Sequence, residues 1–423
     1  MPIPLVEQAV GGVLDTAFRR CSVPADLDSI TTIGEEDGPS DVADELWSRV
    51  EVLYRTGMHP GLQVCIRHQD DVVLERAIGH ARGNLPGRRF DPDRAVPMTV
   101  DTPINLFSAA KAVTGMVVHK LEETGAFTLD DRVADHVPGF DRHGKGDITL
   151  RDVLTHRAGV PTLPAHAFDL DLLLDHERIE AELCNLRPVS APGEKPAYHA
   201  VTGGFIMEAV ARRAAGRSLR DVLAEEIKEP LGLQWFDFGV DPSDAHLVAH
   251  NVMTGLPLGF SVGWFMRRIL GKDWAPVLKL SNDDRFLSGV IPSGNAIVTA
   301  RDVALFYQCL MNGGRIGKTR VFKKKTVKRA LRPSDTDLEF DRMLGMPMRY
   351  SPGFMLGSET FSLYGWNHPD AFGHVGMSNL WTWADPGRDL VVAFLTTGKP
   401  VLGTHLVALP QVIAGIHEAF PPK

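Results

Sequence analysis

A serine and a lysine three residues apart are the residues of this chain whose types and spacing most directly allow chemistry. Ser108 opens the segment Ser108-Ala-Ala-Lys111, and no other serine is followed by a lysine at this spacing. Residues at positions i and i+3 share one face of a helix, so the hydroxyl and the amine would be neighbours. Such a hydroxyl becomes a nucleophile if burial lowers the pKa of the lysine or if the ammonium stabilises the alkoxide. The alternative is a capping serine followed by a solvated lysine, and four residues alone do not decide between the two.

Two later segments could add reactive groups to this pair. Tyr198 follows a proline-glycine turn and precedes a predicted helix. His374 lies in the small-residue segment Gly373–Ser378, where a backbone can approach a substrate closely. Taken singly, the tyrosine could be a half-buried packing residue and the histidine a hydrogen-bonded strand residue. Their order and spacing after Ser108 therefore carry the inference.

The three segments, in this order, resemble the signatures S-x-x-K, Y-x-N and K-T-G or H-x-G of the serine β-lactamase and penicillin-binding-protein superfamily. The resemblance is greatest to the class C β-lactamase-like branch, which includes the family VIII carboxylesterases, and it covers about residues 41–423. Four further segments look like that branch: Leu129–Val133, Leu154–Gly159, Pro292–Asp302 and Asp385–Val392.

The resemblance implies a role for each matched residue. Ser108 would be the acyl-forming nucleophile, and Lys111 and Tyr198 together would be its base, with Tyr198 also giving a proton to the leaving group. The sequence leaves open which of the two takes the serine proton. The backbone N–H groups of Ser108 and Met377 would form the oxyanion hole. No metal or cofactor is implied, and the expected substrate contacts are His374, Val375 and Gly376.

Two departures from the family pattern favour neutral esters as substrates. Ala200 stands where Y-x-N has asparagine, so the amide that contacts acylamido substrates is missing. His374 replaces the lysine of K-T-G, and an imidazole is at best partly charged near neutral pH. We therefore expect a serine hydrolase that cleaves esters of short or medium acyl chains through an acyl-enzyme, with transfer to an alcohol as a second outcome. The alternatives are a β-lactamase or D-amino-acid peptidase and, in another class, a non-catalytic binding protein on the same fold.

Hydrophobic spacing predicts the elements that must position these side chains. A buried helix is expected from Ser108 to Thr124, ended by Gly125. A hairpin is expected over 62–78, because two alternating segments flank a polar turn. The other predicted elements are helices at 41–55, 150–155, 170–186, 202–215, 219–227, 302–311 and 405–420, and strands at 348–355, 373–383 and 390–396.

The resemblance implies an α+β fold of the β-lactamase and DD-peptidase type. An antiparallel sheet flanked by N- and C-terminal helices would be built from residues 41–107 and 290–423. An all-helical domain over 108–289 would be inserted between them, with the site in the cleft. Residues 1–40 would be an N-terminal extension. The glycine-rich apolar stretch 252–270 is predicted to be either core or an apolar cap over the cleft that binds an acyl chain.

Composition restricts the partners. The chain has 423 residues, 44% hydrophobic and 23% charged, which is ordinary for a folded globular protein. Its net charge of −8, without a block of five like charges, argues against nucleic acid as a partner. The partner that the resemblance implies is a small-molecule ester. The oligomeric state is left open.

Cysteine spacing and the N-terminal sequence bear on the compartment. The four cysteines lie too far apart for a zinc knuckle or a redox motif, and we predict free thiols. No stretch reads as a transmembrane segment, and the N-terminus lacks the basic start and apolar run of a signal peptide. A cytoplasmic protein is therefore expected.

Overall fold

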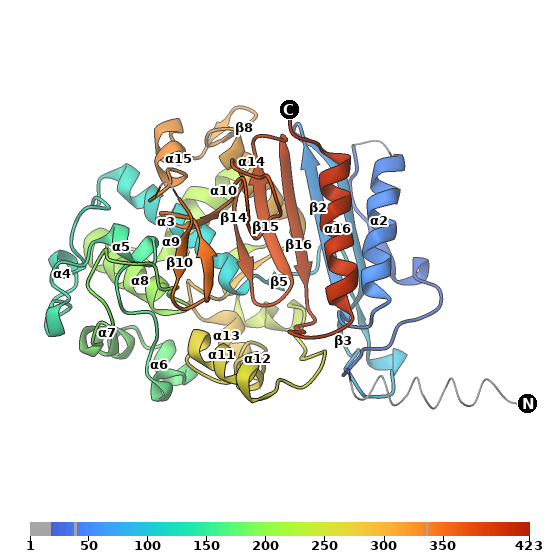
Figure 1. Cartoon of the computed structure of the whole chain (residues 1–423), viewed down its shortest axis with the longest axis horizontal. Helices are drawn as coiled ribbons and strands as arrows, with labels where there is room; N and C mark the ends of the chain where they lie inside the picture. The colour runs from blue at the N-terminus through green and yellow to red at the C-terminus, as the bar shows by residue number, and fades with distance from the viewer. Residues whose placement is uncertain (1–17, 38–39, 336) are drawn as a thin grey trace, which may run out of the picture.

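A large antiparallel sheet runs through the middle of the molecule (Figure 1). The computed structural model describes residues 18–37, 40–335 and 337–423. Within these residues, nine strands form one sheet in the order β1-β3-β2-β16-β15-β14-β13-β12, with β4 paired to β3. The strands are β1 (Thr31–Ile33), β2 (Gly61–His68), β3 (Asp71–Arg82), β4 (Val96–Pro97), β12 (Tyr350–Ser351), β13 (Phe354–Leu356), β14 (Phe372–Gly376), β15 (Leu380–Asp385) and β16 (Leu390–Thr396).

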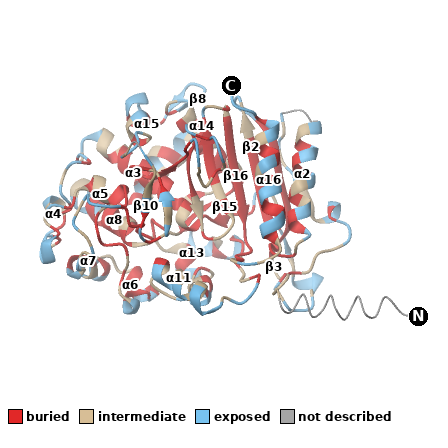
Figure 2. Ribbon diagram, in the orientation of Figure 1, coloured by how far each residue is buried: buried red, intermediate tan, exposed pale blue. Residues whose placement is uncertain are grey.

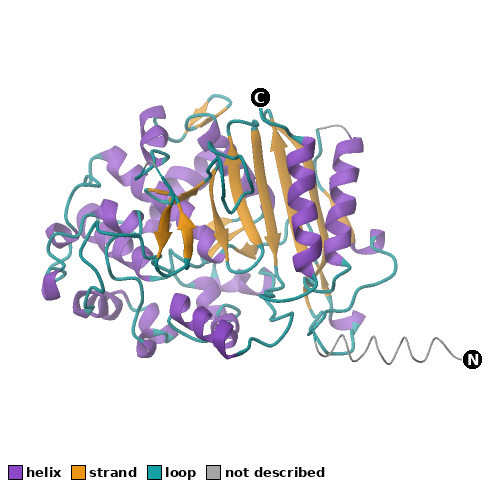
Figure 3. Ribbon diagram, viewed as in Figure 1, coloured by secondary structure: helices purple, strands orange, loops and turns teal. Residues whose placement is uncertain are grey.

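The sheet joins the two ends of the chain. The predicted hairpin is formed by β2 and β3, and β16 pairs with β2 so that Val392 lies opposite Ile66. All seven residues of β16 are buried, as expected for an apolar strand covered on both faces. The predicted α+β class is confirmed (Figure 3).

Helices from both chain ends cover one face of the sheet. α2 (Ser40–Tyr54) and α16 (His405–Ala419) lie side by side on that face (Figure 1). α14 (Ala300–Met311) contacts β2, β15 and β16. Figure 2 shows that buried residues fill the sheet and the inward sides of these helices, whereas the outward sides of α2 and α16 are exposed.

The chain between the early and late strands is mostly helical, as predicted, but it is not purely so. β6 (Phe236–Phe238) pairs with β7 (Ala296–Val298), which also pairs with β5 (Ile104–Asn105). The strand forms because Phe236 and Phe238 alternate into the core and are fully buried. The helices are α3 (Ala110–Thr124), α4 (Val133–His136), α5 (Leu150–Leu154), α6 (Leu170–Leu173), α7 (His176–Asn185), α8 (Thr202–Ala215), α9 (Leu219–Leu223), a π-helical turn (Ala224–Lys228), α10 (Glu229–Leu231), α11 (Phe260–Leu270), α12 (Trp274–Leu280) and α13 (Asp284–Ser288).

Three predicted elements are wrong in detail. The predicted strand 373–383 is the hairpin β14–β15, because Ser378 and Asn379 adopt the left-handed backbone conformation and reverse the chain. The predicted strand 348–355 likewise turns at Gly353, so that β12 pairs with β13. The predicted helix 170–186 is two helices, since Asp175 leaves helical geometry and caps α7. The remaining elements are β8 (Arg315–Ile316), β9 (Thr319–Arg320), α15 (Lys324–Ala330), β10 (Glu339–Asp341) and β11 (Met346–Met348).

The described part of the predicted N-terminal extension packs along the sheet edge. β1 pairs with β3, and Glu36 forms an ion pair with Arg76 at 2.8 Å. The extension's residues 1–17 and 38–39 lie outside the described residues. Over the part of the chain that the structure describes, no helix is long and apolar enough to cross a membrane. All four cysteines are buried and free.

Candidate active site

A strained turn presents Ser108 between β5 and α3. Phe107 adopts a positive φ of 49°, a conformation that is costly for a residue with a bulky side chain. The turn is held by the Asn105 side chain, which accepts the Phe107 N–H at 3.1 Å, and by the Leu106 N–H, which donates to the Ala296 carbonyl. Ser108 therefore lies in a short 3₁₀ turn, Phe107–Ala109, immediately before the helix that carries Lys111.

The Lys111 amine is buried and lies against the serine. Its Nζ is 3.1 Å from the Ser108 Oγ, 2.7 Å from the Ala200 carbonyl oxygen and 3.1 Å from the Ser293 carbonyl oxygen. Burial lowers the pKa of Lys111 to about 7. An amine with this pKa is largely neutral in mildly alkaline solution, and its lone pair can then accept the serine proton.

Tyr198 covers the same amine from the other side. The Lys111 Nζ lies 4.9 Å from the centroid of the Tyr198 ring. Burial raises the pKa of the Tyr198 phenol, while a hydrogen bond with the Ser108 hydroxyl lowers it in part. The tyrosine is positioned by its backbone N–H, which donates to Asp341, and by the His156 ring, whose centroid is 4.7 Å away. The three predicted catalytic side chains thus come together.

His374, Val375 and Gly376 form the C-terminal end of β14, and none of these three predicted substrate contacts lines the cavity described below. His374 is buried beside Tyr198, with 6.1 Å between ring centroids. Burial lowers its pKa to about 3, so the imidazole is neutral at physiological pH. Packing explains the glycine at position 376, because a Cβ there would lie 2.4 Å from the Leu106 carbonyl oxygen, beside the turn that carries Ser108.

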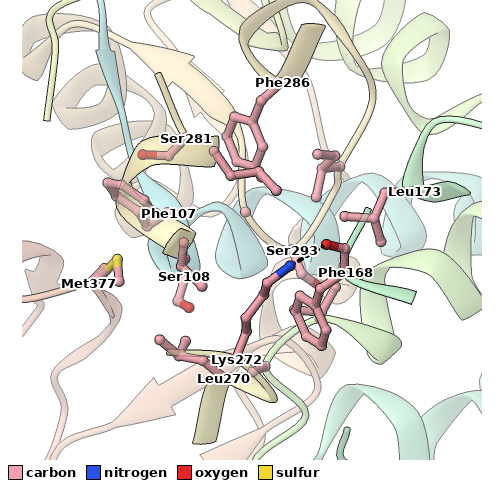
Figure 4. Close-up of a pocket in the computed structure, with 16 residues that line it drawn as sticks. Phe107, Ser108, Phe168, Leu173, Leu270, Lys272, Ser281, Phe286, Ser293 and Met377 are labelled. Carbon is pink, nitrogen blue, oxygen red and sulfur yellow. Dashed lines mark hydrogen bonds between the residues drawn. The ribbon is translucent and has the colours of Figure 1, made fainter. Parts of the chain in front are cut away.

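An apolar cavity of about 80 Å³ opens beside Ser108. Figure 4 shows Ser108 and Met377 on one side of it, with Phe168 and Leu173 opposite. Its one lining cation is Lys272, whose amine donates to the Phe168 carbonyl at 2.8 Å. The lining residues are Phe107, Ser108, Phe168, Leu173, Ala200, Val201, Leu270, Lys272, Val277, Leu280, Ser281, Phe286, Ile291, Ser293, Gly294 and Met377.

Only one end of the predicted cap stretch, residues 252–270, reaches this cavity. Its second half is α11, which supplies Leu270 to the wall. The next helix, α12, supplies Val277 and Leu280, although no role was predicted for this segment. Both α11 and α12 therefore contribute to the wall of the cavity.

Two residues that shape the site, Ser293 and Asp341, were not singled out from the sequence, whereas a third, His156, was expected to be structural or to orient the site. Ser293 accepts from Lys111 through its carbonyl, and the segment around it had been noticed only as family-like. His156 holds the tyrosine segment, accepting the His199 N–H at 3.1 Å. Asp341 binds the Tyr198 N–H from more than a hundred residues away, which no local pattern could have signalled. Among the described residues, no cluster of His, Cys, Asp and Glu suits a metal ion.

Comparisons with known proteins show the family and the fold. Residues 50–413 match the protein family described as Beta-lactamase. The chain is 31% identical over 320 residues to the esterase/beta-lactamase LipL of Mycobacterium tuberculosis, an alignment covering 72% of this chain and 71% of LipL. A family VIII carboxylesterase structure is similar with a TM-score of 0.76 and 26% identity, over 92% of this chain and all of that one. A penicillin-binding protein homologue from Caulobacter crescentus has the same TM-score and coverage at 25% identity.

Proposed function

The chain belongs to the beta-lactamase family of serine hydrolases, and from this premise we propose that it cleaves neutral carboxylic esters through an acyl-enzyme at Ser108. The observation that carries the proposal is the buried Lys111 amine, 3.1 Å from the Ser108 hydroxyl at the wall of an apolar cavity. A hydroxyl beside an amine of lowered pKa is an activated nucleophile.

Lys111 is the proposed base. Two backbone carbonyls, those of Ala200 and Ser293, occupy two of the directions around its nitrogen, and the Ser108 Oγ occupies the third. In the neutral amine, two N–H bonds can serve the carbonyls, while the lone pair faces the serine. Tyr198 is the weaker candidate, because burial raises the pKa of its phenol and keeps the proton on the oxygen.

Tyr198 is the proposed proton donor. The Ser108 Oγ attacks the ester carbonyl carbon and its proton passes to the Lys111 Nζ. The carbon–oxygen bond to the leaving alcohol then breaks, the alkoxide takes the Tyr198 proton, and the Lys111 ammonium returns a proton to the phenolate. Water, or a second alcohol, attacks the acyl-enzyme by the reverse sequence and releases Ser108.

The negatively charged oxygen that forms in each step must be stabilised by hydrogen-bond donors. The backbone N–H groups of Ser108 and Met377 are proposed for this role, because both residues line the cavity beside the nucleophile. Such donors are worth roughly 3–4 kcal/mol in the transition state.

We also propose that the helical segment 108–289 and the sheet-forming segments 41–107 and 290–423 act as the two walls of the site.

The substrate class follows from the surroundings of the cavity. His374 stands in the third motif, buried and neutral, so it offers no fixed charge to a substrate carboxylate. Ala200, which lines the cavity, has only a methyl side chain where the motif calls for an amide. Both features favour an uncharged ester with an apolar acyl chain over a β-lactam or a peptide carboxylate.

The test compares ester and lactam turnover in matched variants. We would measure hydrolysis of p-nitrophenyl acetate, butyrate and octanoate, and of a chromogenic cephalosporin, by wild type, Ser108→Ala and Ser281→Ala. Ester hydrolysis should fall by about 10³-fold or more in Ser108→Ala. Ser281 lines the same cavity but donates its hydroxyl to Leu278, so Ser281→Ala should stay near wild type.

Other outcomes would change the proposal in defined ways. Cephalosporin turnover comparable to that of the esters would make β-lactam hydrolysis the primary activity. If neither is cleaved but a fluorophosphonate labels wild type and not Ser108→Ala, the nucleophile is correct and the ester class is wrong. If wild type is not labelled, the chain is a non-catalytic binding protein on this fold.

A further inference from the structure

The outer side of α11 exposes large apolar side chains to solvent. Phe260, in its first turn, is 92% exposed, and Trp264, one turn later, is 56% exposed. Leu256 precedes them at the same four-residue spacing and is also exposed. Residues four apart lie on one side of a helix, so Phe260 and Trp264 form a single stripe. Aromatic side chains exposed to this degree are costly in water and suggest a surface with a partner.

A second exposed apolar segment adjoins the first. The Leu256 N–H donates to the Leu402 carbonyl at 2.8 Å, which brings the loop before α11 against the loop before α16. Leu402 is exposed, and so are Leu406 and Val407 in the first turn of α16. Figure 1 shows α11 and the start of α16 at the same end of the molecule. We call these residues the apolar rim: Leu256, Phe260, Trp264, Leu402, Leu406 and Val407.

The apolar rim lies on the reverse side of the helix that closes the cavity. On its inner side, α11 contributes Met266 and Leu270 to a small cluster containing Phe107 and Met377. Leu270 also lines the cavity beside Ser108. A single helix therefore separates the proposed acyl site from the exposed apolar surface.

Basic side chains accompany the apolar rim. Residues 260–280, which cover α11, α12 and the link between them, contain four basic residues against one acid. Arg267 pairs with that acid, Asp273, at 2.7 Å, and Lys272 lines the cavity, so Arg268 and Lys279 are the cations left for the surface. This local excess of positive charge stands out in a chain whose net charge is −8. The Arg268 guanidinium lies 5.8 Å from the centroid of the Trp264 ring, so a cation and an aromatic ring share one patch. Exposed aromatic and aliphatic side chains flanked by cations match the chemistry of a lipid surface with anionic head groups.

We propose that the apolar rim docks this protein on a lipid surface that contains anionic head groups. Phe260 and Trp264 enter the interface between head groups and acyl chains, and the basic residues of α11 and α12 remain among the head groups. If the chain cleaves esters as proposed above, apolar acyl esters would reach Ser108 from that lipid surface, and this part of the proposal rests on that function. Burial of the exposed rings supplies the attraction, and the cations add a component that salt weakens.

Binding to vesicles tests the proposal independently of catalysis. We would measure sedimentation with phosphatidylcholine vesicles and with vesicles of phosphatidylcholine and phosphatidylglycerol, for wild type and the Phe260→Ser/Trp264→Ser variant. Wild type should bind the anionic vesicles at least about tenfold more than the variant, and 0.5 M salt should weaken this binding. The control is Trp366→Ser, which removes a 73% exposed tryptophan and should leave binding intact. Its neighbour Gly365 packs against His417, near the C-terminal end of α16 and away from the apolar rim.

Turnover of water-soluble p-nitrophenyl acetate shows that the variants are folded, because neither substituted residue lines the cavity. If that ester is not cleaved but vesicle binding follows the expected pattern, the ester function fails and the docking surface stands. The proposal would be overturned if wild type bound neither kind of vesicle. So would sedimentation equilibrium showing a wild-type dimer that Phe260→Ser/Trp264→Ser makes monomeric, since the apolar rim would then bind a second copy of this chain.

Discussion

The Lys111 amine contacts two backbone carbonyls, one hydroxyl and the face of one aromatic ring. These neighbours replace part of the water that an exposed ammonium would bind, and the pKa falls to about 7 because they do so incompletely. The nearby His374 and Tyr198 are poorer candidates for the proposed base near neutral pH. Burial lowers the pKa of the histidine to about 3 and raises that of the tyrosine above its usual value.

The first prediction concerns the pH dependence of ester hydrolysis. Only the neutral form of Lys111 can take the Ser108 proton, so kcat/KM should rise about tenfold per pH unit below the lysine pKa and level off above about pH 7. No second rise is expected from His374, and no fall from Tyr198 below about pH 10. Initial rates with p-nitrophenyl butyrate between pH 5 and 10 would measure the profile. A bell-shaped profile centred below pH 7 would contradict the assignment.

A second buried lysine provides the control. Burial also lowers the pKa of Lys399 to about 7, and its amine lies 5.1 Å from the centroid of the Phe107 ring. Lys399→Met should keep the rising limb at the same pH, whereas Lys111→Met should lose about 10²–10⁴-fold in kcat. Disappearance of the limb in Lys399→Met would transfer the titration to that residue.

The proximity of the Ser108 and Lys111 side chains could be predicted from the sequence, because residues three apart on helical backbone share one side. The pKa of the amine could not. It depends on the carbonyls of Ala200 and Ser293, which approach from segments 89 and 182 residues distant in sequence. The family resemblance predicted which catalytic residues neighbour Lys111, but only the packing shows how far water is excluded from its amine.

At the scale of elements, the helix that carries Lys111 is held by unusually close packing. The Gly115 position of α3 faces the turn between β12 and β13, where a Cβ at residue 115 would lie 2.7 Å from the Gly353 Cα. His119, one turn further along, hydrogen bonds the Pro352 carbonyl at 3.0 Å. The nucleophile helix is thereby fixed against the late strands of the sheet.

The second prediction is that Gly115→Ala destabilises the protein. The added methyl group must push α3 away from the turn, and such overpacking typically costs about 1–3 kcal/mol, only partly offset by the helix propensity of alanine. Gly263→Ala, in α11, is the matched control, since its Cβ meets nothing within 4 Å. That variant should be as stable as wild type or more stable. Thermal unfolding followed by circular dichroism would decide, and equal melting temperatures for the two variants would refute the argument.

Element positions were largely predictable where apolar periodicity is long, as for α8, which occupies the predicted 202–215. They failed where a short turn reverses an apolar segment. Ser378 and Asn379 make a hairpin out of an expected strand, and neither residue is the glycine that usually marks such a turn. α11 was expected only as part of an apolar stretch. Its packing against the cavity, which the sequence does not show, decides which side of this helix is buried and which is exposed.

At the scale of the molecule, the two ends of the chain build one sheet and the middle of the chain supplies the opposite wall of the site. No local pattern in the sequence pairs β16 with β2, and the expected arrangement came from the family resemblance. Contacts between distant segments must therefore keep the walls aligned. Tyr198 belongs to the middle of the chain, yet the acceptor of its N–H, Asp341, lies at the end of β10.

The third prediction is that Asp341 fixes Tyr198 across this junction. One carboxylate oxygen accepts the N–H groups of Tyr198, Met343 and Leu344 at 3.2, 2.8 and 2.8 Å, and the other accepts the Tyr350 hydroxyl at 2.9 Å. Asp341 is fully buried, so Asp341→Ala leaves these donors without a partner at about 1–3 kcal/mol each. We expect Asp341→Ala to lower both the melting temperature and kcat, the latter by about tenfold or more, because the proposed proton donor loses its support.

Two further variants separate positioning from general damage. Asp341→Asn keeps an oxygen acceptor for the backbone donors, so kcat should recover to within about threefold of wild type. Asp302 is another buried carboxylate that accepts a backbone N–H, from Trp235 at 2.7 Å, but it contacts none of the proposed catalytic residues. Asp302→Ala should therefore lower the melting temperature while leaving kcat per folded molecule unchanged. A comparable loss of kcat in Asp302→Ala would mean that Asp341 acts through stability alone. A loss of kcat in Asp341→Ala but not in Asp302→Ala would show that the junction sets the position of Tyr198.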